Sequence, residues 1–145
     1  MQPNGNVFIT NIEKATIDNG YYRKVLFTTS KQQLVIQCIK PGEDIPFEIH
    51  DDMDQFIRVE KGTGELFVGA NKEVKHQLSD GIAVIIPAGT YHQIINTSTK
   101  DNLHVYTIYS PPNHSANLVQ VDRPMKETGG ANINRRYFTH MKYMY

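Results

Sequence analysis

The chain is predicted to be an all-β protein, a sandwich or barrel of mostly antiparallel strands. Apolar and β-branched runs are short, turn residues bound most of them, and they recur about every 8–12 residues. Between residues 20 and 110, no window shows the period of an amphipathic helix. The runs that we interpret as strands are 23–29, 33–39, 55–60, 64–69, 73–79, 82–86, 91–97 and 103–110.

Short turn segments connect these predicted strands. Residues 61–64 (KGTG) and 69–72 (GANK) have the composition of hairpin loops, with glycine available for positive φ. Residues 79–81 (SDG) form a turn before a buried strand. Pro87 ends the next strand because it has no N–H to donate to a ladder. Successive hairpins indicate an antiparallel architecture.

The 145 residues are expected to form one domain. We divide it into an N-terminal edge segment (1–20), a barrel (21–112) and a C-terminal arm or short helix packed on the barrel (113–145). The first segment fits either an edge strand or a short helix. The last segment fits an arm against the barrel or a partner subunit, or else a lid or binding tail.

Charge and composition exclude several classes of partner. Lys+Arg and Asp+Glu both number 15, so the formal charge is zero and no basic field attracts nucleic acid or anionic lipid. The single cysteine, Cys38, excludes an internal disulfide. No apolar run reaches 18 residues and no signal peptide is visible, so we expect a cytoplasmic protein that binds a small molecule, without membrane or nucleic acid.

Four polar residues at predicted strands suggest a metal site. Glu48 and His50 are two residues apart and share a face if they lie on a strand. Gln55 begins the next predicted strand, and His92 follows the turn at residues 87–89. Two imidazoles and one carboxylate around an open position suit a divalent transition metal. Glu-x-His alone is a weak signal, because any exposed strand face can carry it.

Two glycine-framed stretches make the signal specific, because they resemble the two signature motifs of the cupin superfamily. The first family motif is G-x5-H-x-H-x(3,4)-E-x6-G, and this chain has the same spacing with Glu48, His50 and Gln55 at the polar positions, between Gly42 and Gly62. The second motif is G-x5-P-x-G-x2-H-x3-N. Every fixed position of it is present, as Gly81, Pro87, Gly89, His92 and Asn96.

The resemblance covers roughly residues 20–112 and implies a double-stranded β-helix, the jelly-roll barrel of cupins. It also implies a divalent metal (Mn, Fe, Ni, Co or Zn) held by Glu48, His50, Gln55 and His92. Two identities depart from the family pattern, since Glu48 replaces a histidine and Gln55 replaces the glutamate. The carboxylate has thus moved from the second strand to the first, which leaves the ligand charge unchanged but permits a weaker or empty site.

Small single-domain cupins include sugar-phosphate isomerases, lyases and dioxygenases, so the resemblance implies a metal-dependent enzyme acting on a small polar molecule. Glu48 and His114 are the candidate catalytic residues, as groups that could move a proton. The alternatives are a non-catalytic module that binds a small molecule or metal, and a structural dimer with a vestigial site. We also expect a homodimer, because the edges of an open sandwich need cover.

Overall fold

A computed structural model describes residues 6–125 of the chain. One helix, α1 (Ile12–Asp18), precedes the strands. The strands are β1 (Arg23–Thr28), β2 (Gln33–Ile39), β3 (Asp44–Glu48), β4 (Asp54–Lys61), β5 (Gly64–Val68), β6 (Val74–Leu78), β7 (Ala83–Ile86), β8 (His92–Ile95), β9 (Leu103–Ser110) and β10 (Val119–Gln120). Each of the eight predicted runs overlaps one strand, whereas β3 and β10 lie outside those runs.

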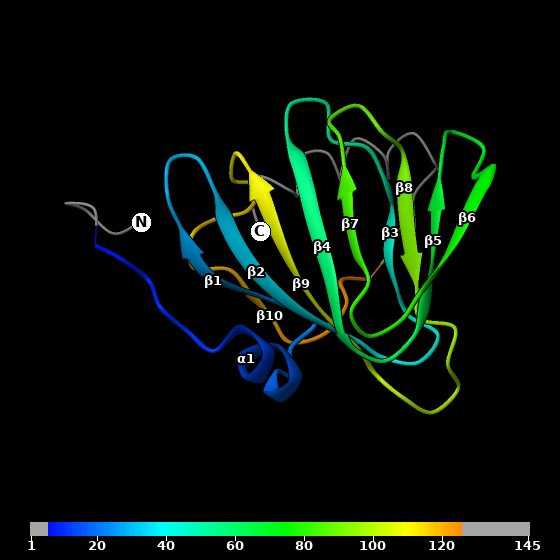
Figure 1. The fold of residues 1–145 in the computed structure, drawn as a ribbon, viewed down its shortest axis with the longest axis horizontal. Coiled ribbons are helices and arrows are strands. Elements are labelled where there is room, and N and C mark those ends of the chain that lie inside the picture. The colour runs from blue at the N-terminus through cyan, green and yellow to red at the C-terminus, as the bar shows by residue number, and fades with distance from the viewer. Residues whose placement is uncertain (1–5, 126–145) are drawn as a thin grey trace.

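The strands form two antiparallel sheets that face each other (Figure 1). The larger sheet has the order β10-β1-β2-β9-β4-β7, and the smaller one has the order β3-β8-β5-β6. Neighbours within a sheet are often distant in sequence, such as β2 and β9 or β3 and β8. This crossed connectivity is that of a jelly roll, and it confirms the predicted double-stranded β-helix.

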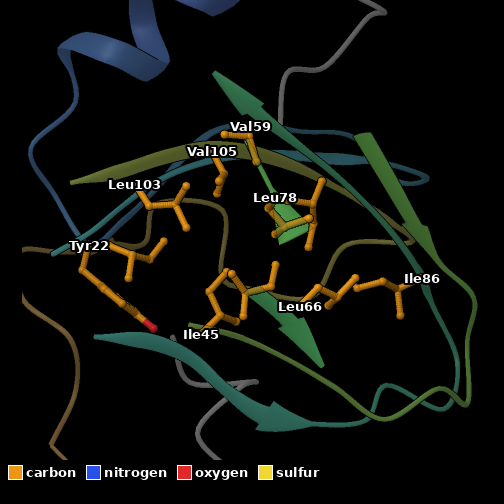
Figure 2. Packing of buried hydrophobic residues seen from close by; sticks show 11 residues of the cluster. Tyr22, Ile45, Val59, Leu66, Leu78, Ile86, Leu103 and Val105 are labelled. Atoms are coloured by element: carbon orange, nitrogen blue, oxygen red, sulfur yellow. The ribbon is translucent and has the colours of Figure 1, made fainter. Parts of the chain in front are cut away.

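Inward-facing residues of the strands fill the space between the sheets, and the alternation of inward and outward positions is clearest along β9. Along β9, the inward positions Leu103, Val105, Thr107 and Tyr109 are at most 1% exposed, whereas the residues between them are half-buried. Figure 2 shows how side chains from both sheets meet in the main apolar cluster. Each large aliphatic side chain buried there contributes about 1.5–3 kcal/mol to folding. This cluster holds the two sheets at a fixed separation.

The N-terminal segment contains a helix rather than an edge strand. Asn11 caps α1, since its side-chain oxygen accepts a hydrogen bond from the backbone N–H of Lys14 at 3.0 Å. The helix packs outside the larger sheet, where the Thr16 carbonyl lies 3.2 Å from Nδ1 of His104. The cap and this contact explain why a seven-residue helix persists at the end of the barrel.

The segment after β9 returns to the barrel. β10 pairs with β1, and Arg123 Nε lies 2.7 Å from a carboxylate oxygen of Asp44 on β3. The predicted C-terminal arm can be followed here only as far as residue 125, because residues 126–145 lie outside the described part of the chain. Within residues 6–125, no helix has the length and hydropathy of a membrane span.

Glycine is required at the turn that follows β4. Gly62 has φ +95°, in the left-handed region, and a Cβ there would collide with the Asn102 carbonyl. This close approach brings the loop before β9 against the β4–β5 turn. The motif glycine is therefore structural.

Candidate metal centre

Glu48, His50 and His92 converge at one point between the sheets. One ligand atom from each residue lies within 4.8 Å of the others. Glu48 Oε2 is 3.4 Å from His50 Nε2 and 4.0 Å from His92 Nε2. The two histidines are almost fully buried and the Glu48 side chain is 29% exposed, so the group opens to solvent on the carboxylate side.

Two strands and one turn deliver these three side chains. Glu48 ends β3 and lies opposite His92, the first residue of β8. His50 lies two residues beyond Glu48, past the end of β3, so the two do not share a strand as the sequence suggested. The backbone N–H of Gly89 donates to the His50 carbonyl at 2.7 Å. This bond places the imidazole beside the turn that leads into His92.

The histidine nitrogens are oriented for ligation. His92 Nδ1 is 2.9 Å from the Thr90 carbonyl, so Nδ1 carries the proton and Nε2 presents its lone pair to the interior. His92 Nε2 is buried without a hydrogen-bond partner, and so are both ring nitrogens of His50. Buried polar atoms are rarely left unpaired in a native fold. These unpaired nitrogens fit a divalent cation beside the Glu48 carboxylate.

The charge states also suit a cation. Burial raises the pKa of Glu48, but the adjacent His50, whose Nε2 lies 3.4 Å from the carboxylate, and the further charge of His92 and Arg23 outweigh that effect. The pKa of Glu48 is therefore lowered, and the carboxylate is ionised at neutral pH. Burial lowers the pKa of His92, although the charge of Glu48 opposes that effect. A neutral imidazole beside an ionised carboxylate is the combination that metal binding requires.

Gln55, the fourth predicted ligand, points into the barrel from β4 and is 1% exposed. Its Nε2 donates to the Thr107 hydroxyl at 3.1 Å, and that hydroxyl donates to the Phe56 carbonyl at 2.7 Å. The chain of bonds fixes the amide so that Oε1 is buried without a partner. An oxygen left free in this way fits a neutral fourth ligand, and the role of Gln55 stays a prediction.

His114, the second predicted catalytic residue, is held at the edge of the site. Gln33 clamps its loop, because the Gln33 amide oxygen accepts the backbone N–H of Asn113 and of His114 at 3.0 and 2.9 Å. His114 Nε2 lies 3.4 Å from the hydroxyl of Tyr109. The Tyr109 ring is 6.0 Å from the His50 ring. Tyr109 thus connects His114 to the three converging residues.

Sequence reasoning missed the interior residues Arg23, Gln37 and Tyr109. Arg23 and Gln37 are 7% and 0% exposed, on neighbouring strands β1 and β2. One signal was present, because glutamine alternates with apolar residues in QLVIQCI, where an inward face would carry Gln33 and Gln37 together. The pairing partner of β2, and so the neighbourhood of Gln37, could not be read from the sequence.

Comparison with known proteins identifies the family. The profile of the cupin domain matches residues 35–109, more than half of the chain. The match includes β3 and β8, which carry Glu48 and His92. The chain belongs to the cupin family, as the two motifs predicted.

Close relatives and a solved structure support this assignment over most of the chain. Protein L612 of Acanthamoeba polyphaga mimivirus is 48% identical over 139 residues, covering 96% of this chain and 86% of that protein. YrkC of Bacillus subtilis (strain 168) is 40% identical over 110 residues, and the match spans 74% of this chain and 59% of YrkC. The crystal structure of BH2720 from Bacillus halodurans superposes with a TM-score of 0.78 at 38% identity, covering 82% of this chain and 92% of that one.

Proposed function

We propose that this cupin is a metal-dependent enzyme that transfers a proton on a small polar molecule, in the manner of a sugar-phosphate isomerase. The observation that carries the proposal is the group of Glu48, His50 and His92, whose ligand atoms lie within 4.8 Å of one another. A divalent ion held there would supply Lewis acidity toward a carbonyl or hydroxyl oxygen of the substrate. An adjacent base is then needed to take the proton from carbon.

Glu48 is suited to two tasks. Its Oε2 faces both imidazoles, as a ligand atom must. The side chain is the part of the group open to solvent, so a substrate reaching the site meets this carboxylate first. Because the pKa of Glu48 is lowered, the carboxylate is ionised at neutral pH, which suits it as a ligand and leaves it free to accept a proton, while the same shift makes it a weaker base.

Tyr109 and His114 are suited to donate a proton, as the counterpart of Glu48, which accepts one. Burial raises the pKa of the Tyr109 phenol, so the hydroxyl keeps its proton at neutral pH. His114 Nε2 lies 3.4 Å from that hydroxyl, and the loop that carries His114 is clamped by Gln33. The pair forms a short path along which a proton can pass between the loop and the interior.

A non-catalytic binding module remains the second candidate, and Gln55 favours it. The family glutamate at this position is replaced by a neutral amide, whose Nε2 is already engaged by Thr107. Gln55 offers the metal at most a neutral amide oxygen, which is a weaker ligand than a carboxylate, and a small molecule could be held at such a site without reaction. Fold alone does not decide between the two.

Solvent proton exchange separates these candidates. The chain, loaded in turn with Mn, Fe, Co, Ni or Zn, would be incubated in D2O with sugar phosphates and keto acids and followed by NMR. We expect deuterium at the carbon next to a carbonyl with the wild type and with His76→Ala, which alters an exposed histidine of β6. His92→Ala should abolish the exchange.

Thermal shift with the same compounds reports binding independently of chemistry, since a ligand raises the unfolding midpoint by mass action. Binding that depends on His92 without exchange would support the module. Exchange that survives in His92→Ala, or an absence of both signals with every metal, would contradict the proposed enzyme.

A further inference from the structure

A second polar group lies inside the barrel that holds the three converging residues. Arg23 on β1 is 7% exposed, and Gln37 on β2 is fully buried. The β1–β2 register pairs Lys24 with Ile36, which brings the preceding residue Arg23 alongside Gln37. Both face inward, because Val25 and Val35, two residues along each strand, belong to a buried cluster with Tyr109.

The polar atoms of this pair are not satisfied by the protein. Arg23 Nη1 donates to the neutral amide oxygen of Gln120, but Nε is buried without a hydrogen-bond partner. Across residues 6–125, no carboxylate oxygen lies within 4.0 Å of the Arg23 guanidinium. Both amide atoms of Gln37 are also buried and unpaired. A buried cation without a counter-charge is costly to a fold, so an anionic ligand would relieve the cost.

Arg23 acts on the same interior as the candidate metal centre. Its positive charge is among the causes that lower the pKa of Glu48, and it also opposes the rise of the Tyr109 pKa. Its guanidinium carbon is 5.0 Å from the centre of the Tyr22 ring, which packs along its side. The guanidinium is thus fixed in place, within electrostatic range of Glu48 and Tyr109.

We propose that Arg23 and Gln37 bind a carboxylate group of the substrate, in the same barrel interior that holds Glu48, His50 and His92. This assignment rests on the proposed function and narrows its candidate substrates from sugar phosphates and keto acids to small carboxylic acids such as the keto acids. The Nε edge of a guanidinium and an amide N–H match the two oxygens of a planar carboxylate. A phosphate dianion fits less well, because a single cation faces it and the ionised Glu48 lies nearby.

The test observes Arg23 itself in metal-free protein. The side-chain Nε–H resonances of uniformly 15N-labelled chain would be recorded while glycolate is added to about 50 mM, since ligands of about five heavy atoms reach millimolar dissociation constants. The Arg23 signal is assigned by its loss in Arg23→Lys. Glycolamide, the neutral isostere, and inorganic phosphate form the comparison arms.

We expect a saturable shift of the Arg23 signal with glycolate and none with glycolamide. By thermal shift or calorimetry, Arg23→Gln should weaken glycolate binding at least tenfold. Lys24→Gln removes the same charge from the neighbouring outward position of β1 and should bind like the wild type. Arg23→Lys keeps the charge but lacks the planar guanidinium edge. It replaces Arg23→Gln as the test of weakened glycolate binding if Arg23→Gln fails to fold.

Three outcomes would overturn the assignment: no saturable shift with glycolate, an equal response to glycolamide, or tighter binding of phosphate than of glycolate. Repeating the titration in His92→Ala separates this inference from the metal proposal. Glycolate binding without any metal retention would leave the Arg23 site standing and the enzyme proposal wrong. Metal retention by the wild type without glycolate binding would refute the Arg23 site alone.

Discussion

The backbone N–H of Gly89 donates to the carbonyl of His50 at 2.7 Å. This bond joins the two motif stretches, because Gly89 belongs to the turn that delivers His92 and His50 follows β3. Gly89 has φ +81°, which places it in the left-handed region. The geometry of both histidines therefore depends on a turn that only glycine adopts without strain.

Gly89→Ala should loosen this link. A Cβ at Gly89 meets no atom within 4 Å, so the cost is that of the backbone conformation alone, about 1–2 kcal/mol of unfolding free energy. We expect lower stability and weaker metal retention. Gly20→Ala is the matched control, since its Cβ also meets open space and its φ is not positive. Equal urea midpoints for the two variants would show that the turn at Gly89 carries no strain.

The stability of the metal-free chain should depend on pH through its buried histidines. Burial lowers the pKa of His92 and of His104 below the usual value. Below about pH 6.5 the unfolded chain therefore binds protons that the folded chain does not, and stability falls as the pH decreases. Above that pH both states are neutral at these groups and stability should be level.

Urea unfolding at several pH values between about 7.5 and 5 measures this slope. The stability of His92→Gln should depend less steeply on pH than that of the wild type, and His104 should account for the remaining slope. His76→Gln, at an exposed position of β6, should keep the wild-type slope. A wild-type stability that stays constant through this range, or an unchanged slope in His92→Gln, would count against a buried neutral His92.

Gln55→Glu should strengthen metal binding and lower the stability of the metal-free protein. The substitution returns a carboxylate to the position where the family motif has one, and it breaks the amide donation to Thr107. In the metal-free state a carboxylate at this buried position should cost about 1–3 kcal/mol of unfolding free energy. Bound metal should restore the lost stability. Calorimetric titration with Zn(II) and Mn(II) measures the affinity, and an affinity equal to that of the wild type would mean that Gln55 does not face the metal.

A second copy of the chain is the partner that we propose for the edge of the larger sheet. β7 ends that sheet, and Ile82 and Ile85 at this edge are 41% and 68% exposed. Two identical edges related by a two-fold axis can pair antiparallel and cover these side chains. Light scattering should give twice the 16.5 kDa of one chain. Ile85→Lys should shift the mass to one chain and Val7→Lys should not, whereas a monomeric wild type would rule the dimer out.

The strands were predictable because alternation and turns are local signals. The two motifs also predicted that Glu48, His50 and His92 would meet. Other features depend on contacts between distant segments. The pairing of β3 has a register shift between Ile45 and Glu48, and the strand ends at Glu48, before His50. Gln33 holds a loop 81 residues away, and Arg23 meets Gln37 only through the β1–β2 register.

The metal content of the purified chain is the most direct test of the site formed by Glu48, His50 and His92. Elemental analysis would follow purification without added metal and again after loading with each divalent ion. We predict close to one ion per chain in the wild type, retained in His76→Ala and lost in the Glu48→Ala/His92→Ala variant. A wild type that holds no ion under any loading condition, or a double variant that holds as much as the wild type, would contradict the site.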